Sequence, residues 1–265
     1  PEEGEWTSAE PIKVVLQGDA TKFYYANSQD KKLVKYYPYD DRGTTEKVKN
    51  LKNEYFDIAL LSDGSIYGVT YDGNLYNLNY EDTSIINLDY GINTLTADDH
   101  DVLYYMTGGS TLKSYRINQS VHSFGTLENY QSSGDLVFVN DELFLLASDG
   151  SKEHLLRLDV DENGVEAVSL TTLESNPFGL SELDGVLFVT YSNNDVEAYD
   201  TVGNLLSDDF KKISLRNGYN RTYGATKGTD GVFVKYKVTF DTDGGLPVPA
   251  DQQIAVGGKV KIPDE

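Results

Sequence analysis

The sequence predicts an all-β fold, a six-bladed β-propeller with a partial C-terminal β-repeat module. The chain contains 20 tyrosines and 24 glycines, a composition typical of strands joined by tight turns. No stretch keeps the 3.6-residue apolar period of an amphipathic helix. Most tellingly, a four-strand unit recurs at spacings of 45, 35, 43, 43 and 44 residues, counted from Ile12, Asp57, Ile92, Asp135, Phe178 and Thr222. That spacing matches the roughly 40–50 residues of a propeller blade.

Each unit reads as an apolar inner strand, a hairpin and an outer strand. The predicted inner strands are 12–17, 57–62, 92–97, 135–140, 178–183 and 222–227. The hairpins pair 22–28 with 33–39, 65–71 with 75–81, 101–108 with 112–118, 142–149 with 155–161, and 186–193 with 196–202. Their turns carry Asp, Asn, Gly and Ser, which accept positive φ or form Asx turns. The outer strands are 45–51, 84–89, 121–127, 165–170 and 210–215.

The sixth unit shows only two strands, between Arg221 and Tyr236. We expect residues 3–9 to supply its outer strand, because a ring closed by both chain ends leaves no exposed strand edge. A β-sandwich of the same strands is the alternative, although a sandwich does not require a single repeated period.

The propeller segment resembles a bacterial repeat family. The phrases LFVTYSNNDVEAYDTVGNLL (187–206) and FYYANSQDKKLVKYYPYD (23–40) are similar to YVTN-type propeller repeats, in which a Tyr-Val-Thr-Asn strand is followed by a turn and a second strand. The resemblance is loose and covers residues 11–236. It implies a propeller fold and says almost nothing about a ligand.

The C-terminal segment KVTFDTDGGLPVPADQQIAVGGKVKIPDE (237–265) resembles the start of the Listeria–Bacteroides repeat, of internalin B-repeat type. The Gly-Tyr-x-Phe-x-Gly-Trp block that completes the family module is missing. We therefore expect a propeller over residues 1–236 and an incomplete module over 237–265, which is partly disordered or pairs with an open strand edge. The family implies an extracellular or surface-attached bacterial protein, and we expect the natural protein to continue beyond Glu265.

Composition excludes several classes of partner. The chain has 43 acidic and 22 basic residues, a formal net charge of −21, which disfavours nucleic acid and anionic membranes. No cysteine is present, so disulfides and thiolate zinc sites are excluded. No run of about 18 apolar residues exists, and we expect no membrane insertion. The opening PEEGEWTSAE has no apolar leader core and reads as a mature N-terminus. We expect a monomer.

The connections between outer strands and the next inner strands carry the candidate binding residues. Each connection contains an aromatic residue and an asparagine, the combination that stacks on a sugar ring or an extended peptide and bonds to its polar groups. The alternative is that the rings seal the joints between blades and the asparagines cap turns. The candidates are Glu54, Tyr55, Tyr90, Asn129, Tyr130, Asn176, Phe178, Tyr219 and Arg221.

Calcium is the one cofactor that the sequence suggests. Asp159, Asp161 and Asn163 stand at alternate positions before Gly164, like the first half of an EF-hand loop. The second half fails, because Leu170 stands where a bidentate Glu is needed. The alternative is an Asp-rich turn without a metal.

No catalytic residue is predicted. His100, His122 and His154 lie in peripheral strands or turns, and spacing alone cannot show whether one meets a serine and a carboxylate. We expect a non-catalytic, adhesin-type surface module that binds a glycan or protein on one propeller face. The alternatives are a polysaccharide hydrolase or lyase with carboxylates in the central channel, and a structural spacer.

Overall fold

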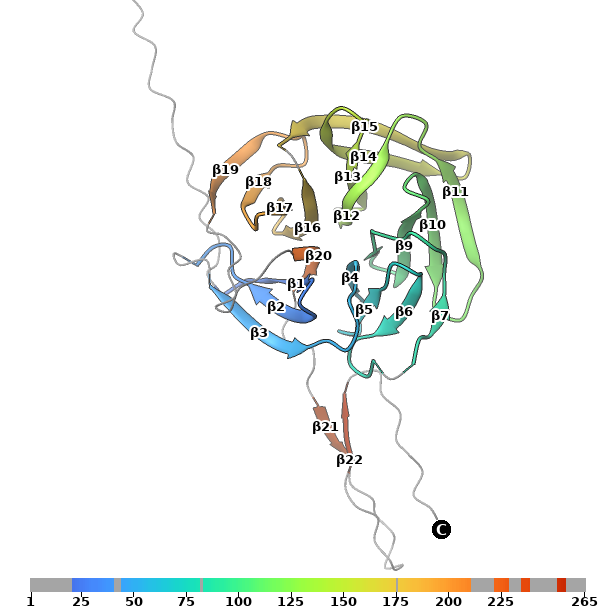
Figure 1. Ribbon diagram of the computed structural model, residues 1–265, viewed down its shortest axis with the longest axis vertical. Helices are drawn as coiled ribbons and strands as arrows, with labels where there is room; N and C mark the ends of the chain where they lie inside the picture. Colours follow the sequence, from blue (N-terminus) through green and yellow to red (C-terminus); the bar gives the residue numbers. More distant parts are fainter. Residues whose placement is uncertain are drawn as a thin grey trace, which may run out of the picture.

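A computed structural model describes residues 21–40, 44–81, 83–174, 176–210, 222–228, 235–238 and 252–255. This part of the chain contains strands and turns but no helix, and so has no apolar helix of the kind that crosses a membrane. Five four-stranded antiparallel sheets stand around a common axis. Figure 1 looks along that axis, with the inner strands near the centre and the outer strands at the rim. The chain is an all-β propeller, as the repeat predicts.

The five blades are numbered in ring order, each given from its inner to its outer strand. Blade 1 contains β20 (Thr222–Lys227), β1 (Tyr24–Ser28), β2 (Lys32–Tyr36) and β3 (Thr45–Asn50). Blade 2 contains β4 (Asp57–Leu60), β5 (Ile66–Val69), β6 (Asn74–Asn77) and β7 (Ile86–Asn87). Blade 3 contains β8 (Thr96–Ala97), β9 (Val102–Thr107), β10 (Thr111–Arg116) and β11 (Val121–Thr126). Blade 4 contains β12 (Gln131–Val139), β13 (Glu142–Ser148), β14 (Glu153–Asp161) and β15 (Gly164–Leu173). Blade 5 contains β16 (Pro177–Leu183), β17 (Val186–Tyr191), β18 (Val196–Tyr199) and β19 (Leu205–Phe210).

The predicted number of six blades is wrong, because the first and the last sequence units form one blade. Strand β20 pairs with β1 in the register Tyr24↔Lys227, so the C-terminal inner strand completes the N-terminal sheet. The ring is therefore closed by strands from distant parts of the chain, which removes the open edges of both. The strands expected at 12–17 and 3–9 lie outside the described residues.

A second correction concerns the second strand of the sixth unit, which was expected to end near Tyr236 and to continue the sixth blade. Strand β21 (Lys235–Val238) instead pairs antiparallel with β22 (Gln252–Ala255), in the register Lys235↔Ala255. This hairpin lies outside the ring in Figure 1. The boundary expected between residues 236 and 237 falls within β21, and the rest of 237–265 lies outside the described residues.

Within the described residues, the core consists of five apolar clusters, one in each joint between neighbouring blades. The cluster between blades 5 and 1 shows how the ring closes: Tyr24 of β1 packs on Phe188 of β17, with ring centroids 5.9 Å apart. Both side chains are fully buried. Burying a residue of the size of Phe188 contributes about 1.5–3 kcal/mol, so each joint supplies a substantial share of the stability.

Candidate ligand-binding face

Two buried aspartates tie the five inner strands together at the axis. The backbone N–H groups of Ile58 and Leu95 donate to the Asp57 carboxyl, with N···O distances of 2.7 and 2.5 Å. The other three inner strands are bound by Asp135. Its carboxyl group accepts bonds from the backbone N–H groups of Leu136, Leu180 and Ala225, with N···O distances of 2.6, 2.9 and 2.8 Å. The two side chains together thus bind five amides, one from each blade.

Burial disfavours the ionised form of both aspartates. Burial raises the pKa of Asp135 to about 7. Burial, and then the charge of Asp135, raise the pKa of Asp57 well above its usual range. Asp135 accepts three backbone N–H bonds and Asp57 only two, so these bonds favour the ionised form more at Asp135 than at Asp57.

The axis is closed at this level. Asp57 and Asp135 are both 0% exposed, so neither water nor substrate reaches their carboxyl groups. Gly224 makes room for the pair, since a Cβ at that position would stand 1.9 Å from Asp57 Oδ1. Carboxylates do meet at the axis, as the hydrolase alternative required, but these two are fully buried and bind backbone amides.

Aromatic rings form a continuous arc on one face of the propeller. We define the aromatic arc as Phe178, Tyr223, Phe56, Tyr71 and Tyr90. Successive ring centroids are 6.1, 5.1, 5.1 and 5.0 Å apart, and Phe56 and Tyr223 stack within 10° of parallel. The arc begins beside the axis, where its first three rings come from blades 5, 1 and 2, and runs outward over blade 2.

The outer end of the aromatic arc is exposed and firmly held. The Tyr90 and Tyr71 side chains are 71% and 45% exposed, whereas the other three rings are partly buried. The N–H of Gly91 donates to the Tyr71 carbonyl at 2.9 Å, and the Thr107 hydroxyl donates to the Tyr90 carbonyl at 3.2 Å. The two tyrosines therefore stand on a fixed backbone, which suits a preformed binding surface.

Carboxylates flank the exposed tyrosines. Asp72 follows Tyr71 in the turn between β5 and β6, and its carboxylate accepts a bond from Asn74 Nδ2 at 2.8 Å. Asp89 precedes Tyr90 and accepts a bond from Lys113 Nζ at 3.0 Å. A carboxylate can accept up to about four hydrogen bonds, so both retain acceptor capacity for a ligand's hydroxyl groups.

The structure separates the predicted binding residues into different environments. Tyr90 and Phe178 belong to the aromatic arc. Tyr55 is fully buried between blades 1 and 2, where burial raises its pKa and its hydroxyl donates to Glu81 Oε2 at 3.1 Å. It seals a joint and presents no surface to a ligand.

The remaining predicted residues are spread over the other connections. Tyr130 packs edge-on against His154, with ring centroids 5.4 Å apart. Asn129 and Asn176 are exposed, and Glu54 is half-buried. Tyr219 and Arg221 lie outside the described residues.

The calcium candidate forms the turn of a hairpin between β14 and β15. Asp161 caps this turn by accepting bonds from the N–H groups of Asn163 and Gly164, at 2.7 and 3.1 Å, and these bonds lower its pKa. Asp159 pairs with Arg157 at 3.3 Å. No group of three His, Cys, Asp or Glu side chains within the described ranges is arranged to hold a metal ion.

The three histidines differ in surroundings. His100 is exposed in the turn after β8, and His122 lies exposed on β11. His154 on β14 is 7% exposed, and its two ring nitrogens are bonded to Asp149 and Ser169. The contact between a serine, a histidine and an aspartate, which spacing could not reveal, is therefore present in blade 4.

Comparison with known proteins adds little. No protein-family model matches the chain, and no curated protein matches it. Among solved structures, the chain is similar to a protein provisionally designated a gluconolactonase, with 10% sequence identity and a TM-score of 0.48 over 78% of this chain and 82% of that chain. A likeness this distant does not bear on activity.

Proposed function

We propose that this protein is a binding module that holds a neutral glycan on the aromatic arc, without chemistry at that site. The observation that carries the proposal is the unbroken row of five rings, ending in two exposed tyrosines on a fixed backbone. Sugar rings present flat C–H faces that stack on aromatic side chains, and their hydroxyl groups donate to carboxylates.

The charge of the protein favours an uncharged ligand. The net charge is −21, and Asp72 and Asp89 adjoin the exposed tyrosines. An anionic polysaccharide would be repelled both by the whole surface and by these carboxylates. We therefore expect neutral glycans to bind and sulfated or uronate-rich glycans not to bind.

The resemblance of residues 237–265 to a repeat of secreted and surface-attached bacterial proteins supports an extracellular, adhesin-type role. In such a role the propeller presents its aromatic arc to glycans outside the cell. The arc needs little rearrangement to bind, because its rings already contact one another.

A glycan-array screen followed by calorimetry tests the proposal. Tyr71→Ala and Tyr90→Ala should each weaken binding about tenfold, a loss of about 1.4 kcal/mol per ring. Tyr80→Ala is the matched control, because Tyr80 is 37% exposed but is not part of the aromatic arc, and it should bind like the parent. The proposal would be overturned if the parent bound no neutral glycan. It would also be overturned if the Tyr71→Ala/Tyr90→Ala double variant bound the glycan with the same affinity as the parent.

A further inference from the structure

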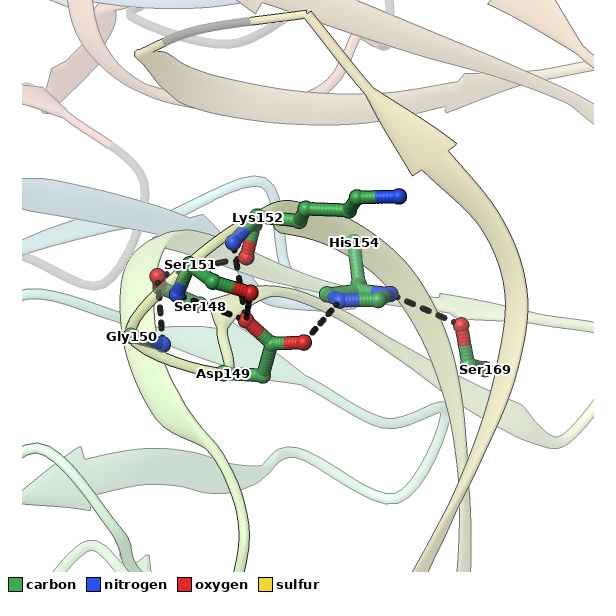
Figure 2. A network of polar contacts seen from close by, with 7 residues as sticks. All are labelled: Ser148, Asp149, Gly150, Ser151, Lys152, His154 and Ser169. Atoms are coloured by element: carbon green, nitrogen blue, oxygen red, sulfur yellow. Dashed lines mark hydrogen bonds and ion pairs between the residues drawn. The ribbon is translucent and has the colours of Figure 1, made fainter.

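Blade 4 holds a serine, a histidine and an aspartate in one hydrogen-bonded line (Figure 2). Ser169 Oγ lies 2.9 Å from His154 Nδ1, and Asp149 Oδ2 lies 3.1 Å from His154 Nε2. One tautomer satisfies both contacts: Nε2–H donates to Asp149, and Nδ1 accepts the Ser169 hydroxyl. This is the order of contacts by which a buried base activates a serine nucleophile.

Asp149 is held in place by its own turn. Its Oδ1 accepts bonds from the N–H groups of Ser151 and Lys152, at 2.7 and 2.8 Å, and from the Ser151 hydroxyl at 2.8 Å. These bonds, led by that of the Ser151 hydroxyl, lower the pKa of Asp149. The side chain therefore stays ionised, and its second oxygen remains free to orient the imidazole.

The histidine is buried and the serine is exposed, which is the arrangement that a reactive serine requires. His154 is 7% exposed and has the Tyr130 ring against its edge, so its orientation is fixed. Ser169 is exposed on β15, the outermost strand of blade 4. The β14–β15 register shifts beside it, with Leu155 opposite Thr171 and Leu156 opposite Ser169. His154 stands opposite Thr172, so Ser169 lies diagonally across from the imidazole on the neighbouring strand and still reaches it, at 2.9 Å.

We propose that Ser169 is a nucleophile, activated by His154 and oriented through Asp149, which cleaves esters of small carboxylic acids. The Ser169 oxygen bonds to the ester carbonyl carbon while its proton passes to His154 Nδ1. The tetrahedral intermediate then expels the alcohol, which takes that proton from Nδ1, and leaves an acyl-serine. Water attacks the acyl group in the same way, releasing the carboxylic acid and restoring the serine.

Esters suit this site better than amides. An alcohol is a better leaving group than an amine, so an ester requires less stabilisation of the intermediate. The nucleophile also stands on an open strand, which admits an acyl group borne on a larger molecule. This activity goes beyond glycan binding and does not depend on it, because the residues involved lie in blade 4, which supplies no ring to the aromatic arc.

Covalent labelling of the full chain tests the inference. The probe is a fluorophosphonate, with the modified residue located by peptide mass spectrometry, and hydrolysis of p-nitrophenyl acetate gives the turnover. We expect the label on Ser169 and not on Ser84, an exposed serine in the connection before β7, which serves as an internal control. Ser169→Ala should abolish both the label and the turnover. His154→Gln should slow the labelling at least about 100-fold, the usual contribution of a general base.

Two results would overturn the inference. One is labelling of Ser169 no faster than of Ser84, and the other is labelling that His154→Gln leaves unchanged. Ser169→Ala removes a single oxygen, and a circular dichroism melt establishes that the variant is folded. A folded parent that reacts at neither serine would show that the network only fastens β15 to the turn at Asp149.

Discussion

A rise in pH from acid to neutral should destabilise this protein through the Asp57–Asp135 pair. Both side chains are fully buried, and burial raises the pKa of Asp135 to about 7 and that of Asp57 well above its usual range. In the unfolded chain both groups titrate near pH 3.9. The folded state therefore holds more protons than the unfolded state above that pH. Stability is then greatest near pH 4 and falls as the pH rises through 7.

The expected size follows from the shift. A carboxyl group whose pKa moves from 3.8 to about 7 binds one extra proton over roughly three pH units. At 1.36 kcal/mol per unit, the loss is about 4 kcal/mol. That is a large share of the 5–15 kcal/mol by which domains are typically stable.

Asp57→Asn isolates the effect. The amide is neutral at every pH and can still donate to Asp135, so the pH-dependent loss should shrink by about one proton, or 1.4 kcal/mol per pH unit. The variant should be about 1–3 kcal/mol less stable than the parent near pH 5, because Ile58 or Leu95 N–H then faces an amide nitrogen.

Urea unfolding followed by circular dichroism between pH 4.5 and 8.5 measures both quantities. This range avoids the acid limb, where carboxylates with lowered pKa values such as Asp149 and Asp161 are protonated and stability is lost as the pH falls. Parallel stability curves for the parent and Asp57→Asn would refute the reasoning, since the pair would then carry no extra proton.

Two further substitutions test the buried joint and the serine network. Tyr55→Phe removes a hydroxyl that donates to Glu81 at 3.1 Å, so it should lower the free energy of unfolding by about 1–2 kcal/mol, and unchanged glycan binding would confirm a purely structural role. Asp149→Asn should slow fluorophosphonate labelling of Ser169 at least about tenfold, because the imidazole loses its anionic partner. Asp161→Asn, at the equivalent cap of the next turn, should leave the labelling unchanged, and equal labelling of the two variants would contradict an orienting role for Asp149.

The sequence predicted the blades better than their number. The predicted hairpin of 142–149 with 155–161 corresponds closely to β13 and β14. The number failed because residues 222–227 and 22–28 each read as part of a separate unit, whereas β20 and β1 are neighbours in one sheet. A local apolar pattern does not show which distant strands pair, so only the three-dimensional structure could show that β20 lies beside β1.

The aromatic arc contains only two of the residues that the sequence singled out. Tyr90 and Phe178 were found because they lie in the connections between blades, where rings recur. Tyr55 matches that pattern equally well, but it points into the joint while the adjacent Phe56 joins the aromatic arc. Tyr223 lies inside a strand and Tyr71 in a hairpin turn, so neither belonged to the predicted set. Among 43 acidic residues, Asp57 and Asp135 could be singled out only by their bonds.

The axis and the aromatic arc are one piece of architecture. Phe56 directly precedes Asp57, and Tyr223 directly precedes Gly224, which makes room for that aspartate. The bonds from Asp57 and Asp135 to one amide in every blade hold the inner strands in place relative to one another. Three of these amides, those of Ile58, Leu180 and Ala225, each lie two residues after one of the inner rings. A row of rings drawn from three blades can stay in contact only if those blades keep their positions. The fully buried pair thus helps to set the geometry of the face that carries the rings, although neither carboxyl group is exposed on that face.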